Sequence, residues 1–163
     1  MIHARTLFGM IAAGALAILA PGCGEGDTTG DEPEGASTSE AMSTKIASSY
    51  GVTTFGGPGD YQALACGGNS RTTNPWYVAS SQRYGCDKHL KLEGNGRCVV
   101  VRTADAGPAS FVESKAGIAV MDASPSVAKH LFGVTSLGWS DVKAHPTKYR
   151  VKATLTTLPL GPC

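Results

Sequence analysis

The chain has 163 residues, of which 21 are glycine and only 17% are charged. Globular domains usually contain ~7% glycine and ~25% charged residues, so this composition favours turns and strands over long helices. Apolar residues make up 42% of the chain, and no continuously apolar stretch reaches the ~18 residues of a membrane span, which excludes a polytopic membrane protein and a fully disordered chain. The net charge of +1 is the sum of the charges of three segments that differ in composition.

The first segment, residues 1–22, has the layout of an export signal. Arg5 precedes an apolar run from Leu7 to Ala20, which is too short to cross ~30 Å of hydrocarbon. Cys23 follows Ala20-Pro21-Gly22, a partial match to a bacterial lipobox, in which the cysteine is lipidated. We therefore expect an exported, membrane-anchored lipoprotein in the periplasm or at the cell surface. Cleavage by an ordinary signal peptidase, which would release a secreted protein, remains open.

The second segment, residues 23–46, is predicted to be a disordered acidic linker. It carries six acidic residues and one basic residue. Its apolar surface is too small to offset the entropy lost on ordering. A linker of this length would hold the following domain away from a membrane surface.

The third segment, residues 47–163, is predicted to be the working domain. It contains twelve basic and seven acidic residues, a balance that favours anionic polymers such as wall polysaccharides. The basic residues are scattered and do not alternate with aromatic residues, so nucleic-acid binding is not expected. We expect a monomer.

Strand patterns dominate this domain, and only one helix is indicated. The helix has Ser124 as its N-cap, Pro125 at its first position and Gly133 as its terminator. Six short strands without a long helix favour a mainly β fold that closes into a small barrel. The segments rich in β-branched and aromatic residues, each bounded by turn residues, are Tyr50 to Phe55, Trp76 to Ser80, His89 to Glu93, Arg97 to Thr103, Gly117 to Met121 and Lys148 to Thr156.

Four cysteines, Cys66, Cys86, Cys98 and Cys163, lie in the domain, and an even number in an exported chain predicts two disulfides. Three pairings are possible. Counting outward from the turn at Asn95 sets Cys98 opposite Leu92, so a bond between Cys86 and Cys98 is out of register, and Cys66 is expected to pair with one of these two. The spacings do not provide the close ligand pair of a zinc site, and we expect no metal and no cofactor.

The order of these segments resembles a known family. GVTTFGG (residues 51–57), ACGG (65–68), a strand that ends in Asp-x-Gly-Pro and a strand that ends in Asp-x-Ser before a short helix resemble the double-psi β-barrel domain of expansins, barwin-like proteins and the rare lipoprotein A (RlpA-like) family. The resemblance covers most of residues 50–157. It implies a six-stranded double-psi β-barrel with one or two short helices.

Two carboxylates are the candidate catalytic groups. Asp105 and Asp122 each follow a predicted strand, so both side chains are expected to project into one groove, and a pair of carboxylates can serve glycan chemistry. The resemblance implies that Asp122 is the essential acid, that Asp105 lines the groove and that Thr54 is the groove threonine. The structural alternatives are that Asp122 helps to cap the helix and that Asp105 forms the turn before Gly107-Pro108.

Further candidates for substrate binding are Tyr61, Tyr84, Phe111 and Glu113. The stretch Tyr61 to Asn69 lacks the acidic residue of glycan-cleaving rare lipoprotein A proteins. We therefore expect an expansin-like domain that binds and loosens cell-wall polysaccharide, peptidoglycan or a related glycan, without hydrolysis. The alternatives are a lytic transglycosylase-like enzyme with Asp122 as general acid, and a barwin-like protein-binding or protease-inhibitor module.

Overall fold

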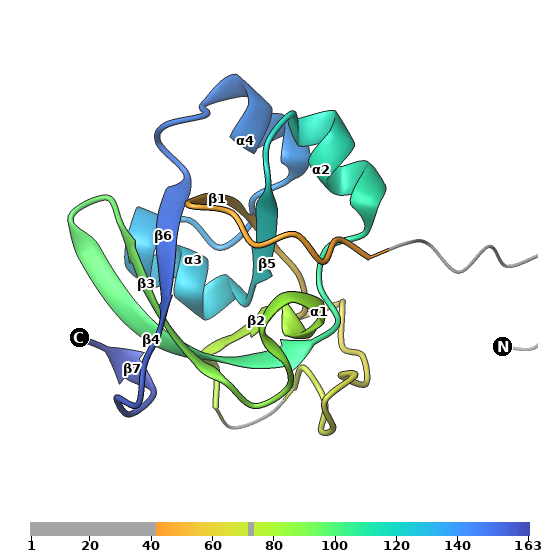
Figure 1. The fold of residues 1–163 in the computed structure, drawn as a ribbon, viewed down its shortest axis with the longest axis vertical. Helices are drawn as coiled ribbons and strands as arrows, with labels where there is room; N and C mark the ends of the chain where they lie inside the picture. The colour runs from red at the N-terminus through yellow and green to blue at the C-terminus, as the bar shows by residue number, and fades with distance from the viewer. Residues whose placement is uncertain (1–41, 72–73) are drawn as a thin grey trace, which may run out of the picture. The chain divides into compact units, whose positions relative to one another are not determined.

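The computed structural model describes residues 42–71 and 74–163, and in this part of the chain a closed six-stranded barrel organises the fold (Figure 1). Going round the barrel, the order is β2, β5, β1, β6, β3 and β4, and β4 pairs with β2 to close it. The expected mainly β fold with a six-stranded barrel is confirmed. The strands are β1 (Tyr50–Thr54), β2 (Tyr77–Ala79), β3 (His89–Gly94), β4 (Arg97–Asp105), β5 (Val120–Ala123) and β6 (Arg150–Leu155), and a short β7 (Gly161–Pro162) is added to β4.

The β3–β4 hairpin is the longest antiparallel pair, and a two-residue turn fixes its register. Asn95 and Gly96 have φ of 52° and 71°, the left-handed values that a tight hairpin turn requires. Cys98 therefore lies opposite Glu93. The sequence-based register, which set Cys98 opposite Leu92, was wrong by one residue because Gly94 belongs to the strand and not to the turn.

Four short helices cover the barrel, α1 (Ser81–Tyr84), α2 (Ser110–Ala116), α3 (Pro125–Phe132) and α4 (Trp139–Ala144). The prediction for α3 is confirmed at both ends. The Ser124 side chain accepts a hydrogen bond from the backbone N–H of Val127, and Gly133 ends the helix in the left-handed conformation. Helices α2 and α4 lie side by side at one end of the barrel (Figure 1). Among the described residues, no helix has the length and apolar character needed to cross a membrane.

The core is made of aliphatic and aromatic side chains from all six barrel strands and from the helices. In β6 the predicted alternation holds for Val151, which is buried, and fails at Leu155, which is 59% exposed at the end of the strand. A second, smaller cluster consists of Leu64, Tyr77 and Ala104 with Phe55 against it. This smaller cluster anchors the loop between β1 and β2.

The two predicted disulfides are present, as Cys66–Cys86 and Cys98–Cys163. The first agrees with the expectation that Cys66 pairs with Cys86 or Cys98. It joins the β1–β2 loop to the segment between α1 and β3. The second joins the start of β4 to the residue after β7.

The predicted export signal and most of the predicted linker, with Cys23, lie outside the described residues. The last residues of that linker, 42–46, are described and contact the domain. Met42 forms a β-bridge with Ala109, and the carbonyl of Lys45 accepts a hydrogen bond from Arg83 Nε at 3.0 Å. The anchor and the cellular location stay predictions of the sequence alone.

Candidate active site

Strand register places Asp122 and Asp105 in one row across the barrel. Thr53 on β1 lies opposite Asp122 on β5, and Ala79 on β2 lies opposite both Asp122 and Asp105. Residues paired in this way point to the same face of a sheet. Two interstrand spacings separate the Cα atoms of the two aspartates by about 10 Å, and the two side chains point to the same face of the sheet.

Asp122 lies within β5, and not after it, because the strand runs from Val120 to Ala123 where the sequence predicted Gly117 to Met121. Gly117, the expected start, instead ends α2 in the left-handed conformation. Asp122 is partly buried, and its Oδ1 accepts a hydrogen bond from the Thr53 hydroxyl. It does not cap α3, because Ser124 does so.

Burial raises the pKa of the Asp122 carboxyl above its usual range, and this effect exceeds the lowering by the Thr53 hydrogen bond. Three charge effects follow in size. The positive charge of Arg83 lowers the pKa of Asp122, whereas the negative charges of Asp105 and Glu113 raise it. A carboxyl in a poorly solvated site near other carboxylates is suited to remain protonated and to act as a general acid.

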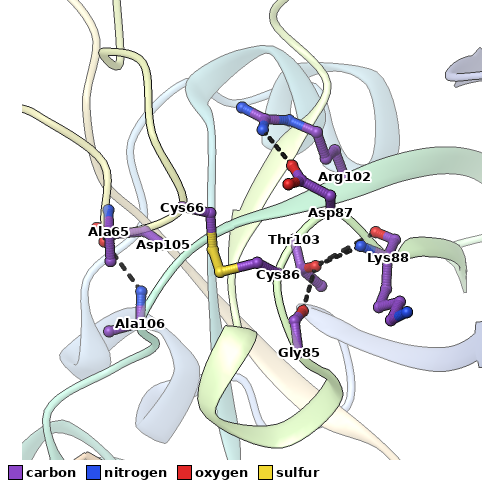
Figure 2. The surroundings of a disulfide bond; sticks show 10 residues. All are labelled: Ala65, Cys66, Gly85, Cys86, Asp87, Lys88, Arg102, Thr103, Asp105 and Ala106. Carbon is purple, nitrogen blue, oxygen red and sulfur yellow. Dashed lines mark hydrogen bonds and ion pairs between the residues drawn. A yellow bond between two sulfur atoms is a disulfide. The ribbon is translucent and has the colours of Figure 1, made fainter.

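Asp105 ends β4 and is fixed by two backbone donors (Figure 2). Its Oδ1 accepts hydrogen bonds from the N–H groups of Ala65 and Ala106, both at 2.9 Å. Ala65 precedes Cys66, whose disulfide to Cys86 and whose N–H bond to Ala104 hold the loop against β4. Both bonds fall on Oδ1, so among the described residues Oδ2 has no hydrogen-bonding partner. The bond to Ala106 agrees with the turn-forming alternative, and it leaves one oxygen for chemistry.

Arg83 and Glu113 form an ion pair beside this row. The Arg83 side chain is completely buried and that of Glu113 is 17% exposed, with 2.5 Å between Nη2 and Oε1. Arg83 also donates to the carbonyls of Lys45 and Val120, and Glu113 Oε1 also accepts from the Val120 N–H. The sequence offered Glu113 as a groove acid or as a solvated side chain. The structure gives it a different place, in a buried ion pair that fixes the start of β5.

The other predicted residues are spread around the barrel. Thr54 faces away from Asp122, and its hydroxyl accepts the Leu137 N–H at 2.9 Å. Tyr84 is partly buried, and its hydroxyl is 2.9 Å from that of Tyr50. Phe111 and Tyr61 are 43% and 42% exposed, and these two lie on α2 and on the β1–β2 loop. The structure therefore brings Asp105, Glu113 and Asp122 together and leaves the three aromatic residues outside this group.

Sequence reasoning missed Thr53 and Arg83. Thr53 is adjacent to the expected Thr54, but the two side chains face opposite sides of β1, and only the register with β5 shows which one meets Asp122. Arg83 lies in a helix of four residues, which has no periodic pattern to reveal it. Within residues 42–71 and 74–163, no group of three or more His, Cys, Asp or Glu side chains is arranged to hold a metal ion.

The closed β-barrel thus carries a desolvated carboxyl and a second carboxylate on the same face, an arrangement that can serve acid-assisted chemistry. The family model described as "AlyA: Lysozyme A" matches residues 41–163, and the chain belongs to this lysozyme family.

Three relatives from Dictyostelium discoideum are similar over 125 residues. Lysozyme B and lysozyme C are each 41% identical to the chain, and lysozyme A is 40% identical. Each match covers 74% of this chain and 64% of the relative, so the chain spans just under two thirds of the length of these relatives. No solved structure matches the chain significantly.

These matches correct the family expected from the sequence. The chain belongs to a lysozyme family and not to the expansin-like, barwin-like or RlpA-like families, and the expected wall loosening without hydrolysis is wrong. The misassignment arose because the motifs quoted for it, Asp-x-Gly-Pro and Asp-x-Ser, mark strand ends in a closed barrel. Such motifs indicate a barrel fold and do not distinguish the families that share it.

Proposed function

We propose that this chain is a glycoside hydrolase that cleaves the polysaccharide of a cell wall, with Asp122 as the general acid. The observation that carries the proposal is the position of Asp122, a partly buried carboxyl with a raised pKa that faces the same side of the barrel as Asp105. Membership of a family whose curated relatives are named lysozymes supports the substrate class.

The hydrogen bond from Thr53 supports Oδ2 as the reacting oxygen of Asp122. Because Oδ1 accepts that bond, the acidic proton resides on Oδ2, which donates it to the glycosidic oxygen as the bond from that oxygen to the anomeric carbon breaks. Thr53 thus acts as a positioning residue. Regeneration of the acid requires one proton from solvent after the product departs.

Asp105 is suited to activate the water. About 10 Å between the Cα atoms of the two aspartates leaves room for a sugar and a water molecule between the carboxylates. Asp105 Oδ2 takes one proton from the water while the hydroxyl adds to the anomeric carbon. After the product departs, Asp105 releases this proton to solvent, so the net change is the addition of one water molecule across one glycosidic bond, with a new reducing end.

The test uses the full chain with isolated peptidoglycan sacculi and measures new reducing ends in the soluble fraction. Asp122→Asn is expected to lower the rate about 100-fold or more, because general acid catalysis contributes ~10²–10⁴. Glu93→Gln is the matched control, since it neutralises an exposed carboxylate on β3. Unchanged release by Asp122→Asn, or an equal loss in both variants, would overturn the assignment.

The pH profile gives a second readout. The acid must be protonated to donate, so the rate falls as pH rises through the pKa of Asp122. Because burial raises this pKa, the fall occurs at a higher pH than an ordinary aspartate would give. A profile that is flat across the acid and neutral range contradicts the proposed role.

A further inference from the structure

The Cys66–Cys86 disulfide lies beside the proposed base, Asp105 (Figure 2). Asp105 accepts the Ala65 N–H, and the next residue along the chain, Cys66, carries the disulfide. The Cys66 N–H donates to the Ala104 carbonyl at 3.0 Å, so two successive backbone donors of the β1–β2 loop meet the end of β4. The disulfide is therefore attached to the same segment that donates a hydrogen bond to the Asp105 carboxylate.

Cys86, on the other side of the disulfide, belongs to a segment that is bonded to β4. The buried Thr103 hydroxyl donates to the Gly85 carbonyl at 2.6 Å and accepts the Lys88 N–H at 2.9 Å (Figure 2). The Asp87 N–H donates to the Thr103 carbonyl, also at 2.9 Å. Cys86 thus lies between residues that are tied to β4 on both sides of it, and the disulfide joins the β1–β2 loop to this fixed segment.

Ala65 itself lies in a tight turn of the β1–β2 loop. The turn runs from Leu64 to Gly67 and is closed by the Gly67 N–H, which donates to the Leu64 carbonyl at 3.0 Å. That bond lies within the loop and does not tie it to β4. Leu64 is buried in the small second core cluster, and the disulfide adds a covalent link one residue after Ala65. We expect this link to limit how far Ala65 can move from Asp105.

The hydrogen bond from Ala65 fixes the direction of the Asp105 carboxylate. Both bonds to this side chain fall on Oδ1, from the N–H groups of Ala65 and Ala106. Ala106 is the neighbouring residue and moves with Asp105, so the bond from Ala65 is the one that ties the carboxylate to another segment. Without it the carboxylate can turn about its Cβ–Cγ bond, and Oδ2 no longer points in one direction. Misplacement of a reacting group by about 1 Å can cost ~10²-fold in rate.

We propose that the Cys66–Cys86 disulfide is a positioning element for the proposed base. It holds the Ala65 N–H on Asp105 Oδ1 and thereby orients Oδ2 toward the water from which it takes a proton. The inference rests on the proposed function, in which Asp105 activates that water. It adds a dependence of the rate on the redox state of one disulfide, which the carboxylates alone do not imply.

A dithiol can reach this bond, because Cys86 is exposed and Cys66 is partly exposed. A thiolate of the dithiol attacks one sulfur, and its second thiol then closes a cyclic disulfide. Two electrons and two protons pass to the protein, and both cysteines are released as thiols. Dithiothreitol is therefore expected to lower the rate of the parent chain and to have no further effect on a chain that lacks Cys66 and Cys86. An equal effect of dithiothreitol on both chains would overturn the redox dependence.

The experiment compares two disulfide variants of the full chain on peptidoglycan sacculi, after thermal unfolding has confirmed that each is folded. For Cys66→Ala with Cys86→Ala, the rate at saturating sacculi is expected to fall about tenfold, while the half-saturating amount of sacculi is unchanged. Cys98→Ala with Cys163→Ala is the matched control, because Cys98 lies about 23 Å from Asp105 along β4. Its rate per soluble protein is expected to equal that of the parent. Equal losses in the two variants would overturn the positioning role.

Ala65→Pro tests the hydrogen bond itself and keeps the disulfide. Ala65 is the second residue of the turn from Leu64 to Gly67, a position that favours proline. The proline ring takes the place of the hydrogen that Asp105 accepts, so the same fall of about tenfold at saturating sacculi is expected. A folded Ala65→Pro protein with the rate of its parent would overturn the proposal.

Hydrogen exchange of the Ala65 amide gives a readout that does not depend on hydrolysis. Loss of the Cys66–Cys86 bond is expected to speed this exchange about tenfold or more, since a charged acceptor is lost, whereas loss of the Cys98–Cys163 bond leaves it unchanged. Unchanged exchange without Cys66–Cys86 would overturn the proposal, because the rest of the loop would then hold Ala65. A wild-type chain that releases no reducing ends refutes the proposed hydrolysis and leaves this measurement in force, so the two failures are distinguishable.

Discussion

The buried pair of Arg83 and Glu113 is expected to be the most sensitive electrostatic contact in the domain. Arg83→Met leaves the carbonyls of Lys45 and Val120 without their donor and leaves the Glu113 carboxylate without its counterion. Removal of one partner from a buried ion pair costs about 3–5 kcal/mol. Because Glu113 keeps the N–H of Val120 and is 17% exposed, we expect a loss of about 3 kcal/mol in the free energy of unfolding.

The measurement is equilibrium urea unfolding of the full chain, and Arg102→Met is the matched control. The pair of Arg102 and Asp87 is almost as short, at 2.6 Å, but its side chains are 28% and 62% exposed. An exposed pair contributes about 0–1 kcal/mol. A loss for Arg83→Met no larger than that for Arg102→Met would refute the reasoning, since Arg83 differs from Arg102 in its burial and in its bonds to the carbonyls of Lys45 and Val120.

The same variant has a readout that a purely structural role would not change. Arg83 lowers the pKa of Asp122, so its removal raises that pKa and moves the alkaline fall in activity to higher pH. Glu113→Gln has the opposite sign, because the Glu113 charge raises the pKa of Asp122. Shifts in the same direction for both variants would contradict the proposed electrostatics.

Asp122→Asn should stabilise the fold at neutral pH and not at pH 3. The folded state holds the Asp122 proton more tightly than the unfolded state, so the wild-type fold loses stability as pH rises from the unfolded pKa through the raised folded pKa. Thermal unfolding at both pH values checks this prediction, and equal effects at the two pH values would refute it. Gly94→Ala should lower the free energy of unfolding by about 1–3 kcal/mol, because a Cβ at Gly94 would lie 2.5 Å from the Arg150 carbonyl oxygen. Urea unfolding that shows no such loss would contradict this contact. The double variant Cys66→Ala, Cys86→Ala should lower the free energy of unfolding by about 3 kcal/mol, because the disulfide closes a loop of this length. Urea unfolding measures the loss, and an unchanged unfolding midpoint would show that other contacts hold the loop.

The sequence was sufficient for the strands and for one helix, because their signals are local. Ser124, Pro125 and Gly133 specify α3 by their chemistry alone, and Asn95-Gly96 specifies the hairpin. The site was predicted only in part. Asp122 and Asp105 were singled out because each lies at or near the end of a predicted strand, and strand register places both in one row. That they line one groove stays a prediction.

The rest of the site depends on contacts between segments far apart in the chain. Thr53 meets Asp122 across 69 residues and Arg83 meets Glu113 across 30. No local pattern records such pairings. Glu113 illustrates the difficulty, because its short helix α2 has an ordinary polar sequence and its carboxylate is nevertheless buried by Arg83 and the N–H of Val120.

The short strand β7 has a consequence for self-association. On the side of β4 away from β3, β2 pairs with Arg102 to Asp105 and β7 pairs with Val99 and Val100. Without β7, these two valines would present free amide and carbonyl groups, the feature through which edge strands recruit further chains into aggregates. The Cys98–Cys163 disulfide holds this cover in place. Reduction of that bond would therefore expose an unpaired strand edge on a barrel that is otherwise closed. The solubility of the protein would decline before the barrel itself unfolds.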